Sequence, residues 1–416
     1  MAPSPIDGDV NGRASSAIPR DVKVFGAASF FTDVASDMVR PLLPLFVSQV
    51  LRGGGVELGL IEGSADAASS LLKLVSGRWN DRLRGASNEG WRKWLIVAGY
   101  TIAAVARPLT AVATAPVHVL ATRVGDRIGK GIRTAPRDAW IADVTAPAAR
   151  ARAYGLHRAL DNAGAFVGPL VALALLLLAR LDLRTVIALS AVPAAIAIVT
   201  LVVGLRSKRG DAMAPAPTEE ATAADAPRER WPGSLRRFLA VGTILTLANA
   251  SQGFLLLRAG DVGLSTWMVL LVWTGHSGLA AVLNVPLSTL SNRIGLKTTI
   301  AAGWITLAAA QAGFAASSTP ATIIACFALY AVYLALTEGA ERTLVATLAP
   351  DNARGRVFGA YHALVGGAQL AGNLVFGWVW DRFSPGTAFA ASSAVAIAAL
   401  LGFVLLVPVA RTSLHD

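Results

Sequence analysis

Charged residues are scarce in this chain of 416 residues. Asp, Glu, Lys and Arg make up 15% of it, against about 25% in soluble domains, which is too little for a water-facing surface. Cysteine is rarer still, and the single Cys326 excludes a disulfide framework and a cysteine-based metal site. The phosphate-loop pattern Gly-x-x-x-x-Gly-Lys-[Ser/Thr] is absent, which excludes that class of nucleotide site. With 54% hydrophobic residues, the composition predicts a polytopic membrane protein with no cofactor and no metal.

Hydrophobic runs divide the chain into membrane spans, each of which needs about 20 mostly apolar residues. Twelve segments qualify: 22–50, 56–77, 94–113, 117–143, 152–179, 184–205, 237–257, 265–291, 298–316, 321–347, 356–380 and 385–410. Between the sixth and seventh lies a charged stretch rich in Ala, Pro and Glu, which is typical of a flexible linker. We expect an all-α membrane protein built from an N-terminal tail at 1–21, a six-helix half at 22–205, a linker at 206–236, a second half at 237–410 and a C-terminal tail at 411–416.

The placement of Lys and Arg predicts the orientation. Basic residues gather in the N-terminal tail, the loop around 78–93 and the central linker, whereas the loops on the opposite side hold few. Basic loops remain cytoplasmic, so both termini are expected in the cytoplasm, and a multi-pass protein of the bacterial cytoplasmic (inner) membrane is predicted. This asymmetry explains most of the net charge of +11 without a nucleic-acid partner.

The two halves repeat each other. Segment 152–160 (RAYGLHRAL) and segment 356–364 (RVFGAYHAL) share Arg, Gly, Ala and Leu at one constant offset, and each opens the fifth span of its half. Repeats of this kind, with both halves in the same orientation, place a solute site between the halves near the middle of the bilayer.

Segment 77–85 (GRWNDRLRG) follows the second predicted span. It resembles the loop signature between the second and third helices of the major facilitator superfamily, although residues 86–90 are inserted before the next basic pair. Segment 127–131 (RIGKG) resembles its fourth-helix pattern, and segments 30–33 and 129–134 are similar to a bacterial and archaeal branch whose substrates are mostly unassigned. The resemblance covers essentially the whole chain. It implies twelve transmembrane helices in two six-helix halves around a central cavity, and transport by alternating access.

The same resemblance implies gating residues. Asp81 and Arg82 match the motif that helps to hold the family's cytoplasmic gate shut, where a carboxylate can accept from N–H groups at a neighbouring helix start. Segment 164–169 resembles the fifth-helix motif of antiporters and exporters, although the usual trailing Gly pair is absent. Within it, Gly164, Gly168 and Pro169 are expected to permit the bending that rocking of the halves requires.

Charged side chains within spans are expected to face water or protein, since each costs about 2.5–3.5 kcal/mol at the centre of a bilayer. They gather on the first, fourth and tenth spans, which together with the seventh line the family's cavity. The candidate substrate-binding residues are Arg40, Arg123, Arg127, Lys130, Asn249, Gln252 and Glu338. The candidate proton-coupling residues are Asp33, Asp37, Asp126, Glu341 and Arg342.

Helical spacing suggests how these charges pair. Asp126 with Lys130, and Glu338 with Arg342, stand four residues apart, which favours pairing along one helix. Asp33 and Asp37 stand one helical turn apart and repel each other when both are charged. This repulsion favours the uptake of a proton by one of the two carboxylates. Arg123 and Arg127 likewise require an anion between them, supplied by Asp33, by Asp37 or by the substrate.

The sequence predicts a monomeric, proton-coupled secondary transporter of a small molecule, with the lipid bilayer and protons as its other partners. Segment 164–169 favours an exporter or antiporter. Proton-symport uptake of an organic anion, suggested by the arginines, and lipid flipping remain alternatives. We expect no enzymatic activity, because His, Ser and carboxylate residues are not clustered as a nucleophile and its base require.

Overall fold

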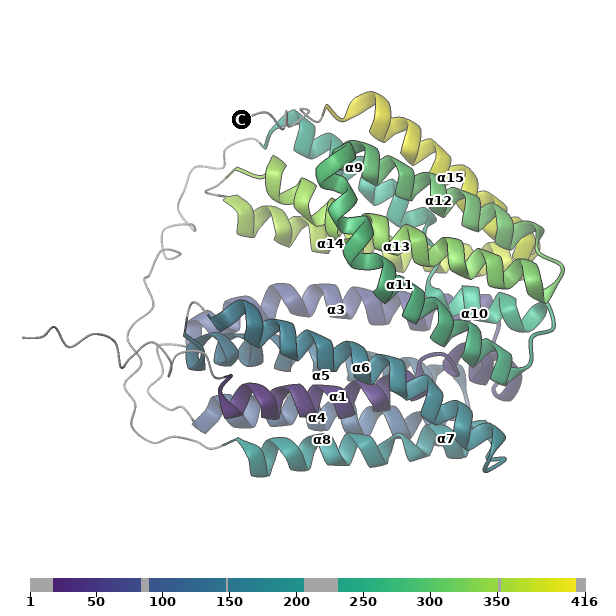
Figure 1. The fold of residues 1–416 in the computed structure, drawn as a ribbon. Helices are drawn as coiled ribbons and strands as arrows, with labels where there is room; N and C mark the ends of the chain where they lie inside the picture. The colour runs from purple at the N-terminus through teal and green to yellow at the C-terminus, as the bar shows by residue number, and fades with distance from the viewer. Residues whose placement is uncertain (1–17, 84–89, 147–148, 206–230, 351–352, 409–416) are drawn as a thin grey trace, which may run out of the picture.

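A computed structural model describes residues 18–83, 90–146, 149–205, 231–350 and 353–408, and within these residues the regular structure is entirely helical (Figure 1). The helices are α1 Arg20–Val39, α2 Leu43–Leu45, α3 Gly55–Leu83, α4 Gly90–Leu109, α5 Pro116–Val144, α6 Arg150–Leu177, α7 Leu183–Leu189, α8 Ala191–Gly204, α9 Gly233–Ala248, α10 Gln252–Asp261, α11 Thr266–Ile294, α12 Leu296–Ala316, α13 Pro320–Leu348, α14 Arg354–Arg382 and α15 Pro385–Leu406. The predicted C-terminal tail, residues 1–17 of the predicted N-terminal tail and residues 206–230 of the predicted linker lie outside the described residues.

Each of the twelve predicted spans corresponds to one long helix or to an interrupted one. The first span is α1 and α2, which continue into a π-helical turn over Phe46–Val50. The break follows Arg40 because Pro41 has no N–H to donate to the helix. The sixth span is α7 and α8, and the seventh is α9 and α10, separated at Asn249–Ser251 by extended backbone. The twelve-helix bundle predicted from the sequence is therefore consistent with this arrangement.

Nine helical spans among the described residues are long and apolar enough to cross a membrane. The predicted spans outside that set are the first, second and fourth, which correspond to α1–α2, α3 and α5. These same helices carry Asp37, Glu62 and Asp126. Charge, rather than length, thus distinguishes these three spans from the rest.

The helices form two groups, α1–α8 and α9–α15, which Figure 1 shows one above the other. The same kind of contact joins two helices in each group, α4 with α8 and α12 with α15. Lys93 at the start of α4 donates to the carbonyls of Val202 (3.1 Å) and Leu205 (2.7 Å) at the end of α8. Lys297 at the start of α12 donates to those of Val404 (2.9 Å) and Val407 (2.8 Å) at the end of α15. Cations stabilise helix carboxyl ends, and the matching positions support the duplication seen in the sequence.

The bundle has two ends, which we name from the chain. The linker end is where α1 and α9 begin and α8 and α15 end; the far end is where the chain passes from α2 to α3 and from α14 to α15 (Figure 1). The two groups touch mainly through α3 with α14 and through α6 with α11. On the second of these seams, Leu270 of α11 joins an apolar cluster with Val34 and Met38 of α1 and Ala172 of α6.

Glycine brings α3 and α14 into backbone contact near the far end. A side chain at Gly59 would meet the carbonyl of Asn373, and one at Gly377 would meet that of Gly55. Only glycine permits so close an approach of two backbones. At the end of this seam, Asp381 of α14 accepts from the N–H groups of Gly55 (2.7 Å) and Val56 (2.8 Å), and so caps α3 from the opposite group.

Candidate solute cavity

A cavity of about 290 Å³ lies between the two groups. Its lining comes from the end of α1, from α3 and α5, from the break between α9 and α10, and from α13 and α14. The polar lining residues are Arg40, Glu62, Asp66, Arg127, Asn249, Ser251, Gln252, Tyr330, Gln369 and Asn373. Because Arg127, Tyr330 and Gln369 stand near the middle of their helices, the cavity lies about halfway between the two ends of the bundle.

The wall formed by α1, α3 and α5 carries charge, most of it paired. Arg40 bonds Asp37 at 3.3 Å, so the two predicted first-span residues pair with each other. Arg123 of α5 bonds Glu62 of α3 at 3.1 Å, with both side chains largely buried. The sequence predicted an anion between Arg123 and Arg127, supplied by Asp33, by Asp37 or by the substrate. For Arg123 the anion is instead Glu62 of α3.

Asp126 corrects a second expectation. It bonds Arg107 of α4 at 2.8 Å rather than Lys130, and both partners are buried. Arg107 also donates to the carbonyl of Thr32 on α1 at 3.1 Å. Through Arg107, Asp126 therefore connects α5 to α4 and α1. The predicted partner Lys130 is exposed, whereas Asp126 is buried within its own helix group.

Two opposite charges on this wall remain unpaired. Asp66 and Arg127 both line the cavity, and within the part of the chain that the structure describes, the side chain of neither forms a hydrogen bond or an ion pair. The Nε atom of Arg127 is buried without a partner, as are those of Arg40 and Arg123. The missing ion pair leaves the cavity with one unpaired group of each sign.

The opposite wall is formed by amides and a phenol. Where α9 ends, the amide of Asn249 donates to Tyr333 (3.2 Å) and accepts from Tyr330 (3.3 Å). The amide of Asn373 accepts from the backbone N–H of Ser251 at 3.0 Å. Beyond Ser251, whose buried hydroxyl has no partner, α10 begins with N–H groups that no preceding helical turn can satisfy. This wall thus offers neutral donors and acceptors and the positive end of a helix dipole.

Four of the seven predicted substrate-binding residues line the cavity: Arg40, Arg127, Asn249 and Gln252. Arg123 lies beside a small neighbouring void with Arg107 and Asp126. Lys130 and Glu338 are absent from the described lining of the cavity.

The predicted pair on α13 is present but exposed. Glu338 and Arg342 bond at 3.2 Å with about half of each side chain accessible. Glu341, the neighbouring predicted proton carrier, instead accepts from the indole of Trp304 on α12 at 2.8 Å. The two glutamates of α13 therefore point to different surroundings.

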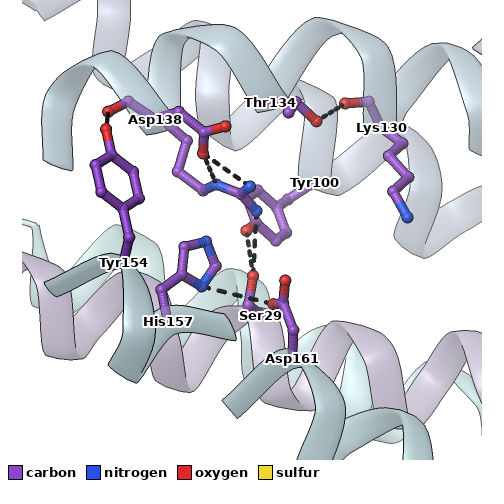
Figure 2. A network of polar contacts seen from close by, with 9 residues as sticks. Ser29, Tyr100, Lys130, Thr134, Asp138, Tyr154, His157 and Asp161 are labelled. Carbon is purple, nitrogen blue, oxygen red and sulfur yellow. Dashed lines mark hydrogen bonds and ion pairs between the residues drawn. The ribbon is translucent and has the colours of Figure 1, made fainter. Parts of the chain in front are cut away.

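A second polar cluster lies between α1, α4, α5 and α6 (Figure 2). Arg137 of α5 bonds Asp138 at 2.9 Å and donates to the hydroxyl of Ser29 at 3.2 Å. One turn away, the Arg133 guanidinium stacks over the ring of Tyr100 at 4.1 Å. These contacts hold the linker-end part of α5 against its neighbours.

His157 and Asp161 of α6 complete this cluster, with 3.5 Å between Nδ1 and Oδ1. Figure 2 shows the two side chains joined by this contact, with Ser29 beside it. Asp33 of α1 lies against α6, because a side chain at Gly164 would meet its Cβ. Asp37, one turn further along α1, pairs with the cavity residue Arg40.

Comparison with known proteins identifies the family. The model of the Major Facilitator Superfamily matches residues 25–273 and 238–415. The chain belongs to the major facilitator superfamily. A similar relative is an uncharacterised MFS-type transporter of Methanocaldococcus jannaschii, 28% identical over 95% of this chain and 96% of the relative.

Solved structures of other transporters share the fold. The nucleoside transporter NupG superposes with a TM-score of 0.72 at 13% identity, covering 94% of this chain and all of that one. A D-xylose-proton symporter superposes with a TM-score of 0.67 at 15% identity, covering 94% and 97%. This protein is accordingly a multi-pass membrane transporter of the superfamily.

The predicted gating residues lie on two helices. On α6, a side chain at Gly164 would meet the carbonyl of Phe30, and one at Gly168 would meet the backbone at Val34 and Asp37. Pro169 is buried next to them, and α6 continues through it. Asp81 and Arg82 occupy the last turn of α3, and their side chains lie outside the described part of the structure.

Glu62, Asp66 and Arg107 are the site residues that sequence analysis missed. A signal was present for the first two: carboxylates four residues apart inside the predicted span 56–77, on one helical face. Arg107 stands alone near the end of its span, and only the packing of α4 against α5 reveals its partner.

Proposed function

We propose that this superfamily member is a proton-coupled secondary transporter that exports a small polar solute by alternating access through the central cavity. The observation that carries the proposal is a mid-bundle cavity with walls from both helix groups and charged and amide side chains facing inward. At about 290 Å³, it lies at the lower end of the range of ligand pockets, roughly 300–1,000 Å³. The solute is accordingly small.

The conformation described corresponds to closure at the far end. Glycine-mediated backbone contact between α3 and α14, together with the Asp381 cap on α3, seals the groups there. Alternating access then requires these contacts to part while others form at the linker end. Asp81, Arg82, Gly164, Gly168 and Pro169 are the gating residues proposed for that exchange.

Proton coupling is assigned to the carboxylates of α1. Asp37 is buried and bonds Arg40, which lines the cavity. Protonation of Asp37 would release Arg40 toward a solute, and this links proton uptake to binding. Asp33, one turn earlier and packed against Gly164 of α6, provides the next carboxylate along the same helix.

The coupling direction is tested in proteoliposomes with an imposed pH gradient and a panel of labelled metabolites and drugs. Antiport predicts uptake driven by an acidic lumen, whereas symport of an organic anion predicts uptake driven by an alkaline lumen. Movement of a fluorescent phospholipid without solute uptake would support the flippase alternative instead.

Asp37→Asn and Arg127→Ala are each expected to abolish gradient-driven uptake, because one removes the proposed proton carrier and the other the unpaired cavity cation. Uptake is measured at matched protein insertion. Asp143→Asn is the control, since that carboxylate pairs with Arg92 and does not line the cavity, and it is expected to retain full uptake. Gradient-driven uptake at the normal rate in both cavity variants would refute the proposed coupling.

A further inference from the structure

The unpaired charges of the cavity belong to two facing rows of charged side chains, one on α3 and one on α5. We call these rows the charge ladder, and each facing pair of opposite charges is one rung of it. These helices pack along each other and run in the same direction from the far end toward the linker end. Glu62 and Asp66 stand four residues apart on α3, and Arg123 and Arg127 stand four residues apart on α5. Four residues are about one helical turn, so each helix presents two charges on one face.

One rung of this ladder is closed and the next is open. Glu62 and Arg123 bond at 3.1 Å. Asp66 and Arg127 stand one turn further along, where the same register would pair them, yet no ion pair or hydrogen bond joins them within the described residues. Both line the cavity, and Arg127 Nε is buried without a partner. Two opposite charges at a similar level of the bundle thus line one cavity without an ion pair between them.

We propose that the solute is a small zwitterion that completes the open rung, with its anionic group on Arg127 and its cationic group on Asp66. This inference rests on the proposed function and names its substrate class. An anion alone would satisfy Arg127 but leave Asp66 unpaired beside it. A cation alone would leave Arg127 unpaired.

The other wall fits the same solute. Ser251, Gln252 and Gly253 at the start of α10 line the cavity, and a helix N-terminus favours the anionic group. Gln252, Gln369 and Asn249 provide neutral donors and acceptors, which suit a polar body without further charge.

The experiment measures thermal unfolding of the purified full-length protein in detergent with three matched probe sets. Each set contains an amino acid, the carboxylate that lacks its ammonium group and the amine that lacks its carboxylate. The sets are alanine with propionate and ethylamine, leucine with 4-methylpentanoate and 3-methylbutylamine, and glutamine with glutaramate and 4-aminobutanamide. A ligand that binds the folded state raises the unfolding midpoint.

At least one amino acid is expected to bind at least tenfold more tightly than both of its singly charged analogues. Asp66→Asn should remove the preference over the carboxylate, and Arg127→Gln should remove the preference over the amine. Asp143→Asn is the matched control, because it neutralises a carboxylate of α5 that pairs with Arg92 away from the cavity, and it should keep both preferences. The unliganded midpoint of each variant shows whether it folds.

The inference is overturned if no amino acid binds, or if carboxylates bind as tightly as the amino acids and Asp66→Asn leaves that ratio unchanged. Labelling of engineered cysteines at the two ends of the bundle separates this outcome from failure of the proposed function. Exchange between far-end and linker-end accessibility would show that alternating access stands although the zwitterion does not.

Discussion

Glu62 and Arg123 form a buried ion pair whose two halves depend on each other. Removing one partner leaves an uncompensated buried charge, which typically costs about 3–5 kcal/mol. Glu62→Gln and Arg123→Gln are each expected to lower the thermal midpoint markedly, and the double variant should recover most of the loss. The measurement is thermal unfolding in detergent, followed by intrinsic tryptophan fluorescence.

The exposed ion pair on α13 is the comparison for these single and double variants. Glu338 and Arg342 bond at a similar distance, 3.2 Å, but about half of each side chain is accessible. Exposed pairs contribute about 0–1 kcal/mol, so Glu338→Gln should scarcely move the midpoint. Equal losses at both pairs, or no recovery in the double variant at Glu62 and Arg123, would contradict the assigned burial.

At the scale of helices, the Asp381 contact sets the closure of the far end. Its two oxygens accept from two N–H groups of α3, and an amide in its place offers only one acceptor. Caps of this kind contribute about 1 kcal/mol, which is about fivefold in an equilibrium. Asp381→Asn should therefore shift the population toward the far-end-open state by about that factor.

The shift is measured by electron paramagnetic resonance distances between spin labels at Val112 and Phe383, two exposed positions near the far end of the two groups, in a Cys326→Ala background. A longer distance component should grow in Asp381→Asn. Arg382→Gln, which neutralises the adjacent exposed charge, should leave the distribution unchanged. The same distribution in Asp381→Asn as in the parent would rule out a role in closure.

At the scale of the whole molecule, the sequence predicted the bundle better than the cavity. Long apolar runs determine where helices cross a membrane, so the twelve spans and their duplication were accessible to sequence analysis, and α9–α10 was identified as one span. Its break at Asn249–Ser251 was missed, since the apolar pattern continues across it. Arg127 and Asn249 line the cavity, on helices that the family resemblance indicated, and their role in substrate binding stays a prediction.

The pairing of charges could not be predicted in the same way. Spacing along one helix suggested Asp126 with Lys130, whereas the fold pairs Asp126 with Arg107 of α4. Which faces of two helices meet depends on packing that one sequence does not encode in any local pattern. Glu338 with Arg342 was predicted correctly, because that pair lies on a single exposed helix face where no other helix competes.

The charge content of α1–α2, α3 and α5 also bears on how the chain is made. These spans fall outside the nine that are apolar enough to cross a membrane alone. Glu62 leaves the ribosome 61 residues before Arg123, the partner that neutralises it. Helix α3 therefore carries this carboxylate without its partner until α5 is synthesised, and the charge is compensated only when the two helices pack together.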